Sequence, residues 1–181
     1  MANLKGGSLI RPNVRYMTPA SLFAALLAIC AWICIPVSDI GITLQTFGVF
    51  LALSLLGGKW GSVSVLLYLL LGAVGLPVFS GFRGGAGHLV GVTGGFLWGF
   101  LISGLVYWAL EKTGKLPAMI GGLLACYLCG CIWFCGYSGG GIGFILLRCV
   151  VPYLIPDVLK LWLALSLSNR LQKVIKIPSR T

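Results

Sequence analysis

Apolar residues dominate the chain in long continuous runs, which short polar or glycine-rich segments separate. A helix needs about 20 mainly apolar residues to cross a membrane. A shorter apolar stretch at 142–151 carries Arg148 and follows three glycines, so we interpret it as a re-entrant or surface segment. The pattern predicts one membrane domain over residues 1–181, with six spans at 19–37, 42–57, 60–77, 89–110, 116–137 and 156–171.

The runs predict helices rather than strands because they are apolar throughout, whereas the strands of a membrane barrel alternate over about ten residues. The composition agrees, since 59% of the residues are hydrophobic and only 9% are charged. The apolar run that follows Arg15 is too long for the apolar part of a signal peptide, so we expect the first span to be retained. The expected fold class is an all-α integral membrane protein of six transmembrane helices.

The basic residues predict the orientation, because Lys and Arg collect in cytoplasmic loops. With the N-terminus inside, ten of the 13 basic residues fall on the cytoplasmic side. The outer side holds only Arg83 and Arg148, and Lys160 lies within the last span. Both termini are therefore predicted to be cytoplasmic, and the net charge of +10 reflects this topology and attraction to anionic lipid headgroups. A nucleic-acid-binding function is not expected, because no recognition module is visible.

Asp157 and Lys160 stand out because they interrupt the last apolar run, and a charge at the centre of a membrane helix costs about 2.5–3.5 kcal/mol. Pro156 suits the first turn of a helix, which would place Asp157 at the helix N-terminus, where the helix dipole favours a carboxylate. Lys160 follows three residues later and shares the same face. The residues alone allow two interpretations: a structural ion pair, or a ligand site with an acceptor and a donor.

Several stretches of the chain resemble the BioY family, the substrate-binding (S) components of energy-coupling factor transporters that take up biotin. The resemblance covers nearly the whole chain in the right order. It rests on the sequences Thr43-Leu44-Gln45-Thr46-Phe47, Tyr68-Leu69-Leu70-Leu71-Gly72-Ala73-Val74-Gly75-Leu76-Pro77-Val78-Phe79, Val92-Thr93-Gly94-Gly95-Phe96 and Pro156-Asp157-Val158-Leu159-Lys160.

This resemblance implies a six-helix bundle in the cell membrane that binds biotin at its outer face. It also implies a membrane coupling (T) subunit and two ABC-type ATPases as partners. Asp157 would accept a hydrogen bond from a ureido N–H of biotin, Lys160 would donate to the ureido oxygen, and Gln45 would join from a facing helix. The bundle would reorient against its partner to release biotin inside.

Arg83 is the best-placed cation for the valerate carboxylate, because a guanidinium binds a carboxylate with two parallel hydrogen bonds. The alternative for Arg83 is a solvated loop charge, and Ser80 or His88 compete for the same role. His88 alone is more typical of an interfacial polar residue than of a metal ligand or proton relay. Phe79 and Tyr68 are candidates for the wall around the thiophane ring of biotin, although aromatic residues also gather at membrane interfaces.

Ala20, Ala24 and Ala28 repeat every four residues on the first span and form a face of small residues that another helix can approach closely. This face resembles the alanine motif with which S components dock on the coupling subunit. Packing inside the bundle is the alternative interpretation.

Other functions find little support in the residues. Of the cysteines on the fifth span, Cys126 and Cys129 share one helix face while Cys131 and Cys135 share the opposite one, so they cannot converge on a metal ion. We find no phosphate-binding loop and no hydrolytic motif, and we expect no cofactor and no enzymatic activity. The alternatives that remain are an S component for another small vitamin, a non-transporting scaffold or sensor, and operation alone as a homo-oligomer.

Overall fold

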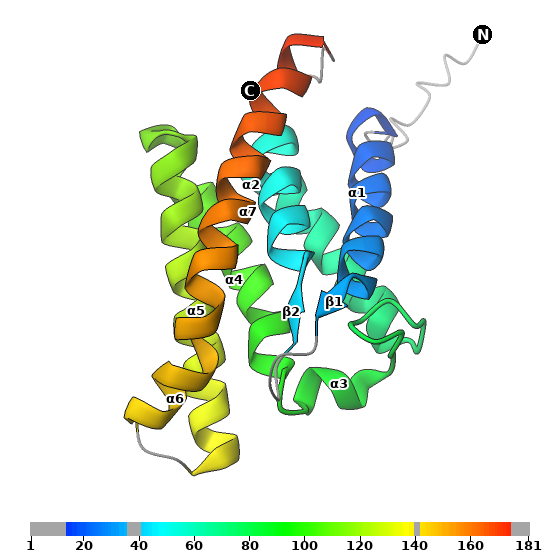
Figure 1. Cartoon of the computed structure of the whole chain (residues 1–181). Helices are drawn as coiled ribbons and strands as arrows, with labels where there is room; N and C mark the ends of the chain where they lie inside the picture. The colour runs from blue at the N-terminus through cyan, green and yellow to red at the C-terminus, as the bar shows by residue number, and fades with distance from the viewer. Residues whose placement is uncertain (1–13, 36–40, 140–141, 175–181) are drawn as a thin grey trace, which may run out of the picture.

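The structure is a computed structural model that describes residues 14–35, 41–139 and 142–174. Figure 1 shows a bundle of long helices that lie side by side. Two short strands pair antiparallel, with Cys34 opposite Thr43. In chain order the elements are α1 (Val14–Trp32), β1 (Cys34–Ile35), β2 (Ile42–Thr43), α2 (Gln45–Ala73), α3 (Ala86–Val90), α4 (Gly94–Leu110), the short 3-10 helix η1 (Glu111–Thr113), α5 (Lys115–Ser138), α6 (Ile142–Cys149) and α7 (Val151–Val174).

Apolar side chains cover the outside of the bundle as well as its core. On α5, Ile120, Leu124, Leu128 and Ile132 are 47–66% exposed, and their spacing of four places them in one stripe along the helix. A helix on the surface of a water-soluble protein carries polar residues there. Among the described residues, three helical stretches are long and apolar enough to cross a membrane: Gln45–Ala73, Gly94–Thr113 and Lys115–Ser138. The chain is therefore a helical, multi-pass membrane protein.

The longest helix, α2, is folded back on itself at Gly57. Gly57 has φ 82° and ψ 167°, which is not helical. A Cβ atom on Gly61 would lie 2.7 Å from the Cα atom of Leu53, so the residues on either side of the turn pack face to face. The side chain of Glu111 accepts a hydrogen bond from the backbone N–H of Gly58 at 2.8 Å and closes the turn. The first half, 45–56, falls within the predicted second span, whereas the second half, 58–73, begins two residues before the predicted third span (60–77) and ends four residues before its end. The total of six spans stays a prediction.

The alanine face of α1 is buried inside the bundle. Ala20, Ala24 and Ala28 are 0%, 2% and 6% exposed, and α1 packs mainly against α2. Small residues let the two helices approach closely. A Cβ atom on Gly48 of α2 would lie 3.0 Å from a methyl group of Leu27 on α1. The burial favours the alternative of internal packing for these alanines, and docking of a partner on this face stays a prediction.

Several helices begin at other residues than the sequence predicted, and the differences are largest for α1, which begins at Val14 rather than at residue 19, and for α4 and α7. α7 begins at Val151, so Pro156 lies inside the helix and Asp157 lies beyond the first turn. The prediction that Asp157 sits at a helix N-terminus was therefore wrong, and the helix dipole does not account for it. The fourth predicted span, 89–110, is interrupted after α3 by extended backbone at Gly91, and α4 begins at Gly94.

The connections between helices are concentrated at one end of the bundle, the lower end in Figure 1, where β1, β2 and α3 lie. α1 begins and α7 ends at the opposite end (Figure 1), as an even number of crossings requires. A loop at residues 74–85 joins α2 to α3 at the lower end, and Trp32 at the end of α1 contacts this loop. Its ring donates a hydrogen bond to the carbonyl of Pro77 at 2.9 Å and stacks on Phe82 at 4.9 Å between ring centroids.

Candidate ligand-binding site

A cavity of about 470 Å³ lies between the helices and this layer of connections. Its walls come from segments spread along the chain: the ends of α1 and β1, the start of α2, the loop before α3, the first turns of α4, the middle of α5 and the first half of α7. The volume falls in the range of about 300–1,000 Å³ that is typical of small-molecule sites. Segments far apart in the sequence therefore meet around one cavity.

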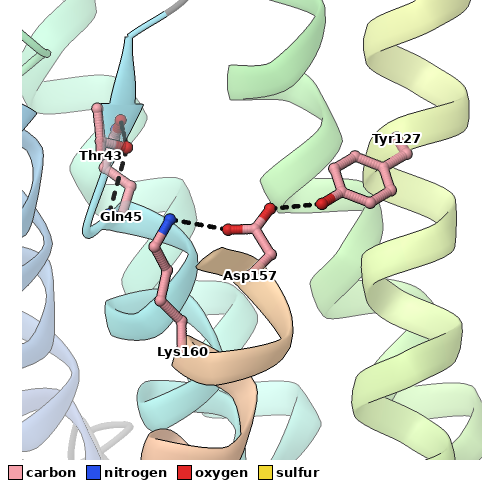
Figure 2. A network of polar contacts seen from close by, with 5 residues as sticks. All are labelled: Thr43, Gln45, Tyr127, Asp157 and Lys160. Atoms are coloured by element: carbon pink, nitrogen blue, oxygen red, sulfur yellow. Dashed lines mark hydrogen bonds and ion pairs between the residues drawn. The ribbon is translucent and has the colours of Figure 1, made fainter. Parts of the chain in front are cut away.

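Asp157 forms the centre of the polar side of this cavity. Its Oδ1 atom accepts a hydrogen bond from Lys160 Nζ at 2.8 Å, and its Oδ2 atom accepts one from the hydroxyl of Tyr127 on α5 at 2.6 Å, as Figure 2 shows. Asp157 is only 4% exposed and Lys160 only 7%. The close ion pair offsets part of the cost of burying two charges. All three side chains line the cavity, so their remaining hydrogen-bonding capacity is available to a bound molecule.

Gln45 lies at the start of α2 and is held on both sides of its amide. Its Oε1 atom accepts from the hydroxyl of Thr43 at 3.0 Å, as Figure 2 shows. Its Nε2 atom donates to the hydroxyl of Tyr68 at 2.6 Å. Gln45 is 5% exposed and lines the cavity, whereas Tyr68 is 1% exposed and lies behind it. The amide is thus fixed in orientation before any ligand arrives.

The apolar side of the cavity is built from aromatic rings. Phe79 is 3% exposed and lies directly against Gly72, where any side chain would collide with its ring. The Phe79 ring meets Tyr68 edge to face at 5.6 Å and His88 at 6.2 Å between centroids. Phe96 and Phe100 of α4 line the same space. A ligand in this cavity meets apolar walls on one side and the charged pair on the other.

The loop at residues 79–83 carries a second cation to the rim of the cavity. Phe79 and Arg83 exchange two backbone hydrogen bonds, of 2.9 and 3.3 Å, and Phe82 between them has a positive φ of 57°. Arg83 is exposed and lines the cavity together with Ser80 and His88. Among the described residues, Arg83 pairs with no carboxylate. The guanidinium therefore lies where it can meet an anionic group at the cavity rim.

Comparison with known proteins identifies the family of this chain. The family model described as the BioY family matches residues 3–177. The chain belongs to the BioY family. Two relatives are the probable biotin transporter BioY of Pyrococcus horikoshii, 38% identical over 84% of this chain and 93% of the relative, and the biotin transporter BioY of Thermotoga maritima, 37% identical over 89% and 98%.

The fold of this BioY family member also matches a solved structure. The crystal structure of an S-component for biotin from an ECF-type ABC transporter superposes with a TM-score of 0.81 at 28% identity, over 88% of this chain and 92% of that one. The match extends over nearly the full length of both chains. The bundle is therefore an S-component fold, as the resemblance in the sequence implied.

The structure brings five of the six predicted ligand residues of this BioY chain to one cavity. Two helices, α2 and α7, and the loop at residues 74–85 supply them, and the sixth, Tyr68, is not part of the lining but positions Gln45 from behind. Which ligand atoms they contact stays a prediction. The five are Asp157, Lys160, Gln45, Arg83 and Phe79.

Tyr127 is the site residue that the sequence analysis missed. It lies in an apolar run among cysteines, where a tyrosine attracts no notice. The available signal was indirect: a buried carboxylate needs more than one donor, and Lys160 supplies only one side of it. His88, expected as an interfacial residue, also lines the cavity.

Proposed function

We propose that this chain is the biotin-binding subunit of a vitamin uptake transporter, which captures biotin at its outer face and delivers it to the cytoplasm with an ATP-driven coupling module. The observation that carries the proposal is the buried Asp157–Lys160 pair, which lines an otherwise largely apolar cavity in a chain of the BioY family. The names of the relatives and of the superposed S-component support biotin as the ligand.

The polar side of the cavity suits the ureido group of biotin. This group has two N–H donors and one carbonyl acceptor in a rigid ring. Asp157 accepts from one N–H, Lys160 donates to the carbonyl oxygen, and Gln45 supplies a further polar contact from α2. In a dry site each of these hydrogen bonds matters, because a buried polar group without a partner costs about 1–3 kcal/mol.

The rest of the ligand matches the rest of the cavity. The apolar thiophane ring fits against Phe79 and the rings of α4, with Tyr68 acting through Gln45 and Phe79 rather than by direct contact. The valerate chain points to the rim, where its carboxylate meets Arg83. This arrangement places one charged or polar partner at each end of the ligand.

The proposed partners are a membrane coupling (T) subunit and two ABC-type ATPases. Support comes from the superposed S-component, which belongs to an ECF-type ABC transporter, and from the lack of a phosphate-binding motif in this sequence. The burial of Ala20, Ala24 and Ala28 inside the bundle argues against this face as the docking surface. Reconstitution in liposomes tests this division of labour: ATP-dependent biotin uptake by the chain without partner ATPases would refute it.

Ligand binding is tested with the purified protein in lipid nanodiscs by titration calorimetry with biotin. We expect Asp157→Asn and Lys160→Ala each to raise the Kd by about 10- to 100-fold, since the first removes the charge of the acceptor and the second removes a charged donor. Lys112→Ala, which removes an exposed cation outside the cavity, is the matched control and leaves the Kd unchanged.

Two outcomes contradict parts of this proposal. Unchanged affinity in both cavity variants would refute the site, while the absence of saturable biotin binding by the wild-type protein would refute the function. Competition distinguishes biotin from another vitamin: desthiobiotin, which keeps the ureido ring, displaces biotin, and lipoate, which lacks it, does not.

A further inference from the structure

Tyr127 touches the charged pair from the side opposite to Lys160. Its hydroxyl donates to Asp157 Oδ2 at 2.6 Å, while Lys160 holds Oδ1 at 2.8 Å (Figure 2). Tyr127 comes from α5, whereas the pair comes from α7, so the contact joins two helices at the polar side of the cavity. The binding scheme proposed above gives this residue no role.

The two anchors together fix the plane of the carboxylate. A carboxylate turns easily about its last side-chain torsion, because the energy profile of that torsion is broad. With Lys160 alone, Asp157 could turn its free oxygen away from the cavity. The second anchor is itself rigid, because the Tyr127 ring packs in a cluster with Phe134, Ile145, Cys149 and Tyr153.

The contact also decides what Tyr127 can offer to a ligand. A phenol has a single proton, and here that proton is given to Asp157, so the hydroxyl oxygen can only accept a hydrogen bond. Asp157 likewise only accepts, and Lys160 only donates. With the phenol proton given to Asp157, this side of the cavity presents the carboxylate as an acceptor next to Lys160 as a donor.

We infer that Tyr127 is a positioning residue that orients Asp157 and makes the cavity select ligands with an N–H donor beside a carbonyl. The inference rests on the proposed function, because the ureido group of biotin has this pattern. It adds a selective element on α5 to a site whose recognised polar residues lie on α2, α7 and the rim.

The test uses the full-length protein in nanodiscs and the variant Tyr127→Phe, which keeps the ring and its packing and removes only the hydroxyl. We expect the Kd for biotin to rise about 10-fold or more, as for the loss of one hydrogen bond to a charged group. Tyr137→Phe is the matched control: it removes an exposed hydroxyl from the same helix outside the cavity and leaves the Kd unchanged.

A double-variant cycle distinguishes positioning from general structural damage. Because Tyr127 acts through Asp157, the combined loss in Tyr127→Phe with Asp157→Asn is smaller than the product of the two single losses. Losses that multiply, or a Kd for Tyr127→Phe within twofold of wild type, would overturn the inference and leave the proposed function standing. A wild-type protein that does not bind biotin would overturn the proposed function, and this inference with it.

Discussion

Replacing the buried ion pair by apolar residues separates its role in binding from its contribution to stability. Lys160→Met removes the cation and leaves Asp157, which is 4% exposed, with Tyr127 as its remaining partner among the described residues. Removing one partner of a buried pair costs about 3–5 kcal/mol, because the other charge stays buried. Since the Tyr127 hydrogen bond persists, we expect the lower end of this range, about 3 kcal/mol.

The double variant Asp157→Leu with Lys160→Met has the opposite expectation. It removes both charges together with the cost of burying them, and apolar replacements of a buried pair are often neutral or stabilising. Tyr127 loses its acceptor but lines the cavity, where water can replace it. We expect the double variant to lie within about 1 kcal/mol of the wild type or above it, and to bind no biotin.

The assay is thermal unfolding in detergent micelles without ligand, followed by tryptophan fluorescence. For a chain of this length, about 1 kcal/mol corresponds to about 2–4 °C in Tm. Lys160→Met should thus lower the Tm by about 6–12 °C, while the Tm of the double variant lies no more than about 4 °C below that of the wild type. A double variant as unstable as Lys160→Met would refute the reasoning, because the pair would then be a source of stability rather than a binding device.

Two further predictions concern the turn in α2 and the cavity rim. Gly57→Ala should destabilise the protein by about 1–3 kcal/mol, because φ is 82° there. The control is Gly136→Ala in α5, which has open space around it. Equal Tm values for the two variants would show that the turn does not need a glycine at position 57. Arg83→Ala should raise the Kd for biotin about 10-fold but leave the Kd for biotin methyl ester nearly unchanged. Arg148→Ala is the control. Equal losses of affinity for both ligands in Arg83→Ala would exclude contact between Arg83 and the carboxylate.

The sequence predicted the helical membrane fold because apolar runs report directly on burial in lipid or protein. It also predicted a break near residues 58–59, although the actual turn needs only Gly57. The ends of helices were less predictable. Pro156 suggested a helix start, but the helix continues back to Val151 because a proline inside a helix removes one hydrogen bond without abolishing the rest.

The candidate site was predictable where a residue type conflicts with its surroundings. Asp157 and Lys160 are costly in an apolar run, so the sequence alone marked them. Tyr127 was not marked, because a tyrosine in a membrane helix has several ordinary roles and only the fold brings it to Asp157. The alanines of α1 were ambiguous for a related reason: small residues allow close approach by any helix, and the sequence does not say which one.

The end of the bundle opposite the cavity bears on how a ligand leaves. There Lys115 of α5 donates to Ser168, Asn169 and Gln172 of α7 at 2.6–3.3 Å, and Gln172 donates to the carbonyl of Ser54 at 2.9 Å. These contacts join α5, α7 and the first half of α2 at the end predicted to face the cytoplasm. A ligand held beside Asp157 would have to break several of them together to pass straight through the bundle, whereas reorientation of the whole bundle leaves them intact. The contacts therefore favour delivery by movement of the bundle against a partner, which is the step that the proposed ATP-driven module would supply.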